Sequence, residues 1–278
     1  MPCTIRNAAR RYSRMDLRGT RLCYRDVGRG PTLLLVHGWA LDLDMWEPQL
    51  AALSNRFRII AVDRRGFGRS SGNTSLPRDV ADLRTLCLRL GLRNIAVVGM
   101  SPGPRIALRL ASSRSLSVRC LVLDGPPAPP RSARDPGTED PPLTHYREVV
   151  ARTGMNAFRR EWRRHPLLKL HQHGREARLL LRRMLARYPG TDLRHRSVMA
   201  PTRIVPELIR TPTLVLCGER DAQYRVAAAV QLVQRLPRVE FRRVAGAGHL
   251  SNLDSPRDYN RLLDAFLRRH PGPGGRRP

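Results

Sequence analysis

The chain has 278 residues, of which 41% are hydrophobic, so it is long enough for one large domain or for a core domain that carries an insertion. No apolar run approaches the roughly 18–20 residues of a membrane span, and we expect neither a membrane anchor nor a signal peptide. The net charge of +28 comes almost entirely from arginine, since Lys169 is the only lysine. These arginines are spread along the chain without interleaved aromatic residues, which argues against nucleic-acid binding.

The cysteines are five in number and widely spaced, with no C-x-x-C pair. This pattern argues against a disulfide framework and against a zinc site. Cys120 and Cys217 lie in apolar, strand-like runs, so we expect both to be buried. With no signal peptide recognised, we expect a cytoplasmic protein.

Strands and helices alternate over the first 124 residues. Residues 1–10 have the composition of a loose leader, and residues 11–36 favour short strands. Asp44 is a candidate cap for the helix that follows. The expected buried strands cover 32–36, 57–62, 95–99 and 118–124, and the expected helices lie near 45–53, 77–90 and 104–111. This alternation predicts an α/β fold with a mostly parallel central sheet and helices on both faces.

A proline cluster at residues 126–130 interrupts the alternation. The residues that follow have a helical pattern and are rich in arginine, with expected helices near 142–153, 155–164 and 174–188. We interpret 131–203 as a helical cap inserted into an α/β core of 11–130 and 204–270, followed by a disordered tail over 271–278. The core pattern resumes with strands at 213–217 and 239–244, helices at 226–236 and 256–268, and a loop at 246–254.

A G-x-S-x-G sequence centred on Ser101 separates a predicted strand from a predicted helix. A serine on such a sharp turn projects its hydroxyl above the sheet, and the flanking Gly99 and Gly103 leave room for the turn. The helix N-terminus favours negative charge that develops there. The five residues alone are a weak signal, because a serine in a glycine-rich turn is common.

A nucleophilic serine needs a base, and the base needs a residue that orients it. His249 lies in a glycine-rich loop after the last strand, and Asp221 ends the strand before it. The order Ser101, Asp221, His249 is the one expected on a strand–turn–helix elbow. Asp124, at the end of another strand, is the rival acid.

With these residues the chain resembles the α/β-hydrolase fold family over residues 15–269. The likeness is to the serine hydrolase branch of enol-lactonases, arylesterases and cofactor-free haloperoxidases. The motifs that carry it are His37-Gly38-Trp39, Asp63-Arg64-Arg65-Gly66-Phe67-Gly68-Arg69-Ser70, Gly99-x-Ser101-x-Gly103, Gly218-Glu219-Arg220-Asp221 and Gly246-Ala247-Gly248-His249.

The resemblance implies a Ser101–His249–Asp221 triad, no cofactor and no metal. It also implies an oxyanion hole built from the backbone N–H of Trp39 and that of the residue after the nucleophile, and Trp39 and Leu250 are expected to contact substrate. The chain departs from the pattern at Pro102, which has no backbone N–H to donate. Proline suits the first position of a helix, so we expect the fold to survive.

Two interpretations follow. The first is a hydrolase of a small carboxylic ester or lactone, and the second is a hydrolase-like protein with weak or no activity because of Pro102. The sequence leaves open the substrate, the choice among hydrolysis, perhydrolysis and acyl transfer, and the oligomeric state.

Overall fold

The computed structural model describes residues 11–113, 115–127, 141–172, 174–195 and 204–272. The leader expected at residues 1–10, the proline-rich junction after Pro127, the end of the cap and most of the expected tail lie outside these residues. Among the described residues, none of the helices has the length and apolar character needed to cross a membrane.

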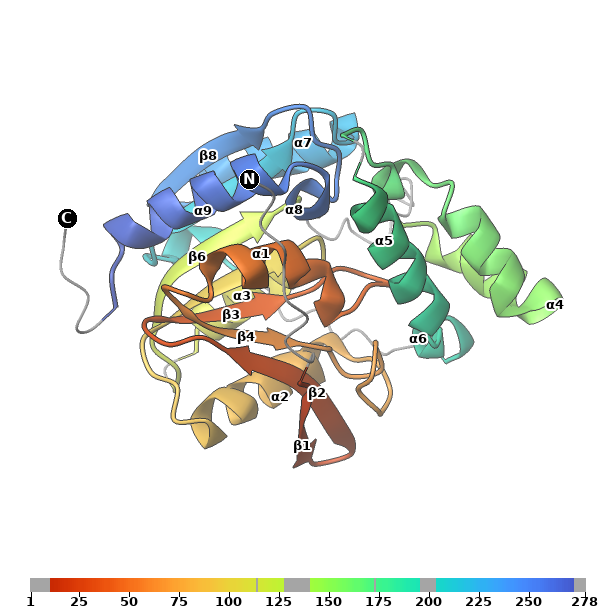
Figure 1. Ribbon diagram of the computed structural model, residues 1–278, viewed down its shortest axis with the longest axis horizontal. Helices are drawn as coiled ribbons and strands as arrows, with labels where there is room; N and C mark the ends of the chain where they lie inside the picture. The colour runs from red at the N-terminus through yellow and green to blue at the C-terminus, as the bar shows by residue number, and fades with distance from the viewer. Residues whose placement is uncertain (1–10, 114, 128–140, 173, 196–203, 273–278) are drawn as a thin grey trace.

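An eight-stranded sheet forms the centre of the molecule (Figure 1), in the order β1-β2-β4-β3-β5-β6-β7-β8. The β1–β2 and β2–β4 pairs are antiparallel, and the other strand pairs of the described residues are parallel. The strands are β1 (Ser13–Leu17), β2 (Thr20–Val27), β3 (Thr32–Val36), β4 (Arg58–Val62), β5 (Ile95–Met100), β6 (Val118–Asp124), β7 (Thr213–Gly218) and β8 (Val239–Val244). The mostly parallel sheet expected from the sequence is confirmed.

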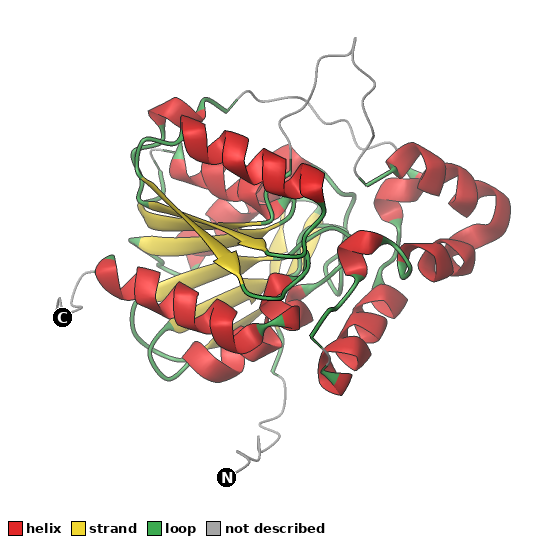
Figure 2. Ribbon diagram, turned by 90° about the horizontal axis from the view of Figure 1, so that it is seen from above, coloured by secondary structure: helices red, strands yellow, loops and turns green. Residues whose placement is uncertain are grey.

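Helices cover both faces of the sheet, as Figure 2 shows. Alternate residues of each central strand point to opposite faces, so Leu33 and Leu35 join one apolar cluster while Leu34 and Val36 join the other. The first cluster includes side chains of α1 (Glu47–Leu53), α8 (Ser251–Asp254) and α9 (Pro256–Arg269), and the second includes those of α2 (Leu76–Arg89), α3 (Gly103–Ala111) and α7 (Gln223–Arg235).

Most of the helical segments between β6 and β7 lie together beside the sheet (Figure 1). They are α4 (Leu143–Trp162), the 3₁₀ turn η2 (Pro166–Leu168), α5 (Arg175–Arg187) and α6 (Thr191–Arg194). We call them the cap helices. Gly154 adopts φ +80° inside α4 and breaks it close to the boundary between the two helices expected at 142–153 and 155–164. The remaining 3₁₀ turns are η1 (Leu43–Trp46) and η3 (Pro206–Leu208).

Two local expectations are wrong. Asp44 does not cap α1: Asp42 is the N-cap of η1, where its side chain accepts the N–H of Asp44. Asp44 is instead fully buried and binds Arg69 and Arg187. The expected loop at 246–254 ends in the short helix α8 rather than continuing to α9. Cys120 and Cys217 are buried, as expected.

Candidate active site

Ser101 stands on a sharp turn between β5 and α3. Its φ of +58° is a conformation that non-glycine residues rarely adopt, and its N–H donates to the carbonyl of Asp124 at 2.8 Å. A Cβ on Gly99 would come within 2.4 Å of the Gly103 carbonyl carbon, and a Cβ on Gly103 within 2.9 Å of the Val36 oxygen. Both positions of the motif therefore need glycine for the turn to close.

His249 lies between Ser101 and Asp221. Its Nε2 is 3.1 Å from the Ser101 Oγ, and its Nδ1 is 2.9 Å from the Asp221 Oδ2. All three side chains are buried. The structure thus brings together the three residues that the sequence singled out from loops far apart in the chain.

The charge state of Asp221 determines which ring nitrogen carries the proton. Burial would raise the pKa of this carboxyl, but His249, the Ala222 N–H and Arg225 outweigh burial and hold the pKa below its ordinary value. An ionised carboxylate only accepts hydrogen bonds, so the proton of the neutral ring lies on Nδ1. Nε2 is then the acceptor that faces the Ser101 hydroxyl.

Asp124, the rival acid, has other contacts. Its carboxyl oxygens accept the Ser251 hydroxyl at 2.9 and 3.1 Å, and burial raises its pKa well above the ordinary range. Among the described residues, neither Asp124 oxygen hydrogen-bonds His249, whereas Asp221 does, so Asp124 is not placed to balance the charge of an imidazolium. A third carboxyl, that of Asp254, holds the loop that carries His249. Its Oδ2 accepts the Gly248 N–H at 2.7 Å.

The loop after β3 passes beside Ser101. A Cβ on Gly38 would lie 3.5 Å from the Ser101 Cβ and 2.7 Å from the Met100 sulfur, so only glycine lets this loop come so close. Pro102, on the other side of Ser101, lies at the start of α3 with φ −68° and ψ −19°. Of the two residues expected to donate a backbone N–H to the oxyanion, Trp39 has this group and follows Gly38 in the loop beside Ser101. Pro102 lacks it.

Two cavities meet at Ser101, and Trp39 and Arg225 line both. The narrow cavity, about 20 Å³, is also lined by His249 and Leu250. The wide cavity, about 170 Å³, extends past Pro102 toward the cap helices. Its other lining residues are Arg64, Phe67, Thr74, Ser75, Leu76, Asp79, Arg105, Pro127, Pro141, Leu143, Arg147 and Asp192. Of the expected substrate contacts, Trp39 lines both cavities and Leu250 lines the narrow one.

The cap helices hold the Trp39 side chain. The indole Nε1 donates to the Asp192 Oδ2 at 2.6 Å, and the Tyr188 hydroxyl donates to the other Asp192 oxygen. The indole also lies within 4.8–6.1 Å, between ring centroids, of four aromatic rings, namely those of Tyr146, Phe158, Trp162 and Tyr188. The cap is thus anchored on the loop that borders Ser101.

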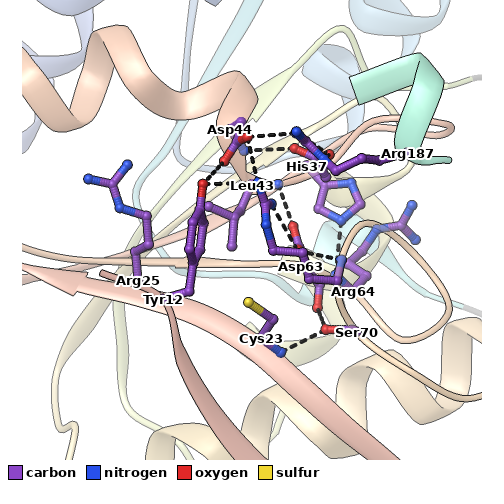
Figure 3. A network of polar contacts seen from close by, with 12 residues as sticks. Tyr12, Cys23, Arg25, His37, Leu43, Asp44, Asp63, Arg64, Ser70 and Arg187 are labelled. Atoms are coloured by element: carbon purple, nitrogen blue, oxygen red, sulfur yellow. Dashed lines mark hydrogen bonds and ion pairs between the residues drawn. The ribbon is translucent and has the colours of Figure 1, made fainter. Parts of the chain in front are cut away.

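A second contact between cap and core lies further along the same loop (Figure 3). Arg187 of α5 binds Asp42 at 2.7 Å and Asp44 at 2.6 Å, and Arg69 also binds Asp44, at 2.8 Å. Burial and the neighbouring Asp42 carboxyl raise the pKa of Asp63 to about 7. This network ties the cap to the loop without contacting Ser101.

Sequence reasoning missed Arg187, Asp192 and Arg225. Each is an ordinary charged residue within a helix, and no local motif distinguishes it from the many surface arginines and aspartates. Among the described residues, no group of three or more His, Cys, Asp and Glu side chains is placed to hold a metal ion.

Comparisons with known proteins agree with this architecture. The family model described as alpha/beta hydrolase fold matches residues 31–196. The chain is 32% identical over 252 residues to the pimeloyl-(acyl-carrier protein) methyl ester esterase of Nitrosomonas europaea, covering 86% of this chain and 97% of that protein. The chain belongs to the α/β hydrolase fold family.

Two solved structures are similar to this chain. The bromoperoxidase of Bacillus anthracis aligns with a TM-score of 0.76 and 25% identity over 89% of this chain and 95% of its own. The enol-lactonase of Burkholderia xenovorans LB400 shares the fold, with a TM-score of 0.74 and 20% identity over 92% of this chain and 99% of its own. The expected likeness to esterases, haloperoxidases and enol-lactonases is confirmed.

Proposed function

We propose that the protein is a serine hydrolase that cleaves a small carboxylic ester or lactone. Ser101 is the nucleophile, His249 the general base and acid, and Asp221 the residue that orients the ring. The observation that carries the proposal is the continuous chain of contacts, 3.1 Å from Ser101 to His249 and 2.9 Å from His249 to Asp221.

In the first half of the reaction the Ser101 Oγ attacks the carbonyl carbon while its proton passes to Nε2 of His249. Asp221 then balances the charge of the imidazolium, and the backbone N–H of Trp39 donates to the oxyanion. His249 then returns the proton to the alcohol oxygen of the substrate, and the bond between that oxygen and the carbonyl carbon breaks. In the second half, water repeats the same steps on the acyl-enzyme and restores the Ser101 hydroxyl.

The size of the site supports a small substrate. The wide cavity of about 170 Å³ is below the roughly 300–1,000 Å³ of typical ligand pockets. Trp39 and Leu250 supply apolar contacts beside Ser101. The esterase relative from Nitrosomonas europaea supports an ester as the bond that is cleaved.

Pro102 supports a second candidate, a fold-retaining protein with weak or no hydrolase activity. A panel of short p-nitrophenyl esters and simple lactones separates the two, assayed with the wild type and with Ser101→Ala. Hydrolysis that Ser101→Ala abolishes supports the enzyme. A wild type no faster than Ser101→Ala on every substrate supports the inactive alternative.

A further inference from the structure

The amide group between Gly38 and Trp39 has an unusual set of contacts, and its importance rests on the proposed function. Since Pro102 removes one of the two donors that the family resemblance implies, the Trp39 N–H is left as the remaining donor to the oxyanion. The orientation and strength of this single N–H then determine how well the site stabilises the transition state.

Two donors converge on the carbonyl oxygen of this amide. The Arg64 Nη2 lies 3.2 Å from the Gly38 oxygen, and the His37 Nδ1 lies 2.7 Å from it. The other ring nitrogen of His37, Nε2, accepts the backbone N–H of Arg64 at 2.9 Å (Figure 3). Because a backbone N–H can only donate, the proton of the neutral ring is on Nδ1, where it points at Gly38.

Arg64 is itself held rigidly. Its Nη1 binds the Asp79 Oδ2 at 3.1 Å, and its guanidinium carbon lies 4.3 Å from the centroid of the Phe67 ring. His37, Arg64 and Asp79 are all buried, and burial together with the charge of Arg64 holds the pKa of His37 well below its usual range. His37 therefore stays neutral, with one donor and one acceptor nitrogen.

These contacts act on the N–H through the peptide plane. The peptide group is planar and almost always trans, so fixing the Gly38 carbonyl on one edge fixes the Trp39 N–H on the opposite edge. Among the described residues, the Trp39 N–H donates no hydrogen bond. Donors on the carbonyl of a peptide also polarise it and make its N–H a stronger donor, most of all where a charged donor acts in a buried site.

We propose that Arg64 and His37 are positioning residues, which orient and polarise the Gly38–Trp39 amide so that one donor does the work that two donors share elsewhere in the family. Among the described residues, neither side chain hydrogen-bonds Ser101 or His249, although Arg64 also lines the wide cavity. The charge of Arg64 reaches the oxyanion through one peptide group.

The neighbouring residue offers a matched control. Arg65 forms an equally buried ion pair with α2, with its Nε 2.7 Å and its Nη2 2.8 Å from the two Asp82 oxygens. Its other hydrogen bonds go to the carbonyls of Arg18 and Gly19, in the turn between β1 and β2, and β4 separates these strands from β3, which Gly38 follows. Loss of the Arg65 pair therefore reports what a buried arginine contributes to the fold alone.

The experiment compares two double variants that each remove a whole ion pair, Arg64→Met with Asp79→Asn and Arg65→Met with Asp82→Asn. Removing both partners leaves no unpaired charge in the interior, so both proteins are expected to fold. Each is assayed for kcat and KM on p-nitrophenyl acetate and for inhibition by an aryl trifluoromethyl ketone. The nucleophilic serine adds to the ketone carbonyl and forms a hemiketal oxyanion. The inhibition constant therefore reports how well the site stabilises the transition state.

We expect the Arg64 pair variant to lose about 10-fold or more in kcat, with KM changed by less than about threefold. Its inhibition constant for the ketone should rise by the factor by which kcat/KM falls. The Arg65 pair variant should keep both values. In a Pro102→Met background, which supplies a second donor, the loss caused by the Arg64 pair should shrink.

Equal kinetic losses in the two double variants, or an unchanged ketone constant in the Arg64 pair variant, would overturn the positioning role. The proposed function would stand in that case, because the wild type would still hydrolyse the ester and bind the ketone. A wild type that does neither contradicts the proposed function itself, and with it this inference.

Discussion

Pro102 follows Ser101 directly, yet the two residues occupy opposite regions of backbone conformation. Ser101 has φ +58°, whereas Pro102 has φ −68° and ψ −19°, close to the value that the proline ring fixes. The proline thus fits the start of α3 without strain. Its effect is chemical rather than structural, because it removes one N–H from the site and leaves the turn intact.

Replacing Pro102 with Met restores that N–H with little change in apolar bulk. We expect kcat on simple esters to rise at least ~10-fold, a change of ~1.4 kcal/mol in the activation barrier, with KM changed much less. Stability should fall by roughly 0.4–1 kcal/mol, because proline restricts the unfolded chain. Steady-state kinetics and urea denaturation measure the two effects.

An unchanged kcat in a fast wild type would mean that another donor already completes the oxyanion hole. An inert Pro102→Met variant beside an inert wild type would instead favour the non-enzymatic alternative.

The triad prediction separates the two candidate acids. Ser101→Ala and His249→Ala should each lower kcat by a factor of about 10³ or more, because the members of a triad act as a unit. Asp221→Asn should lower it strongly, though less completely. Circular dichroism and thermal melts check that each variant is folded. If Asp124→Asn abolishes activity and Asp221→Asn does not, the acid has been misassigned.

Most of the core was predictable from the sequence because its strands are buried on both faces and its helices are amphipathic. Thr32–Val36 and Val118–Asp124 match the expected strands residue for residue. Where one residue takes part in several long-range contacts, local reasoning failed. Asp44 is of a residue type that often caps helices and precedes an expected helix. Its hydrogen-bond partners Tyr12, Arg69 and Arg187, however, come from three distant segments.

The candidate site was predictable where function imposes a local pattern. Ser101 and His249 stand in glycine-rich turns whose tight backbone approaches leave a mark in the sequence. Asp192 and Arg64 carry no such mark, because their contacts to Trp39 and Gly38 arise only when the chain folds. The number and spacing of charged residues did not locate the site either, because arginine occurs throughout the chain.

Arg187 joins the cap to the core, and its removal should destabilise the protein. Arg187→Met leaves Asp42 and Asp44 side by side with less positive charge, although Arg69 remains on Asp44. Since Arg187 is 29% exposed, we expect a loss of about 1–3 kcal/mol rather than the full value of a buried pair. Arg183→Met, an exposed site on the same helix, is the control, and a loss of equal size there would contradict the cap contact.

Asp79 should make stability depend on pH. Burial raises its folded pKa from 3.8 to about 6, so between these values the folded state binds more protons than the unfolded state. The contribution of Asp79 to stability is therefore greatest at low pH and falls as pH rises from about 4 to 6. Asp79→Asn cannot titrate, so the melting temperature of the wild type relative to this variant should fall over that window. If the melting temperature of the wild type relative to Asp79→Asn rises with pH over this window, the raised pKa of Asp79 is contradicted.

The most direct test of the account is labelling by a fluorophosphonate probe followed by peptide mass spectrometry. Such a probe reacts with a serine that a neighbouring base activates, and it needs no knowledge of the substrate. We predict stoichiometric modification of Ser101 in the wild type, strong slowing in His249→Ala and no modification in Ser101→Ala. A folded wild type whose Ser101 stays unmodified, or is modified no faster than in His249→Ala, would contradict the claim that Ser101, His249 and Asp221 form a working catalytic triad.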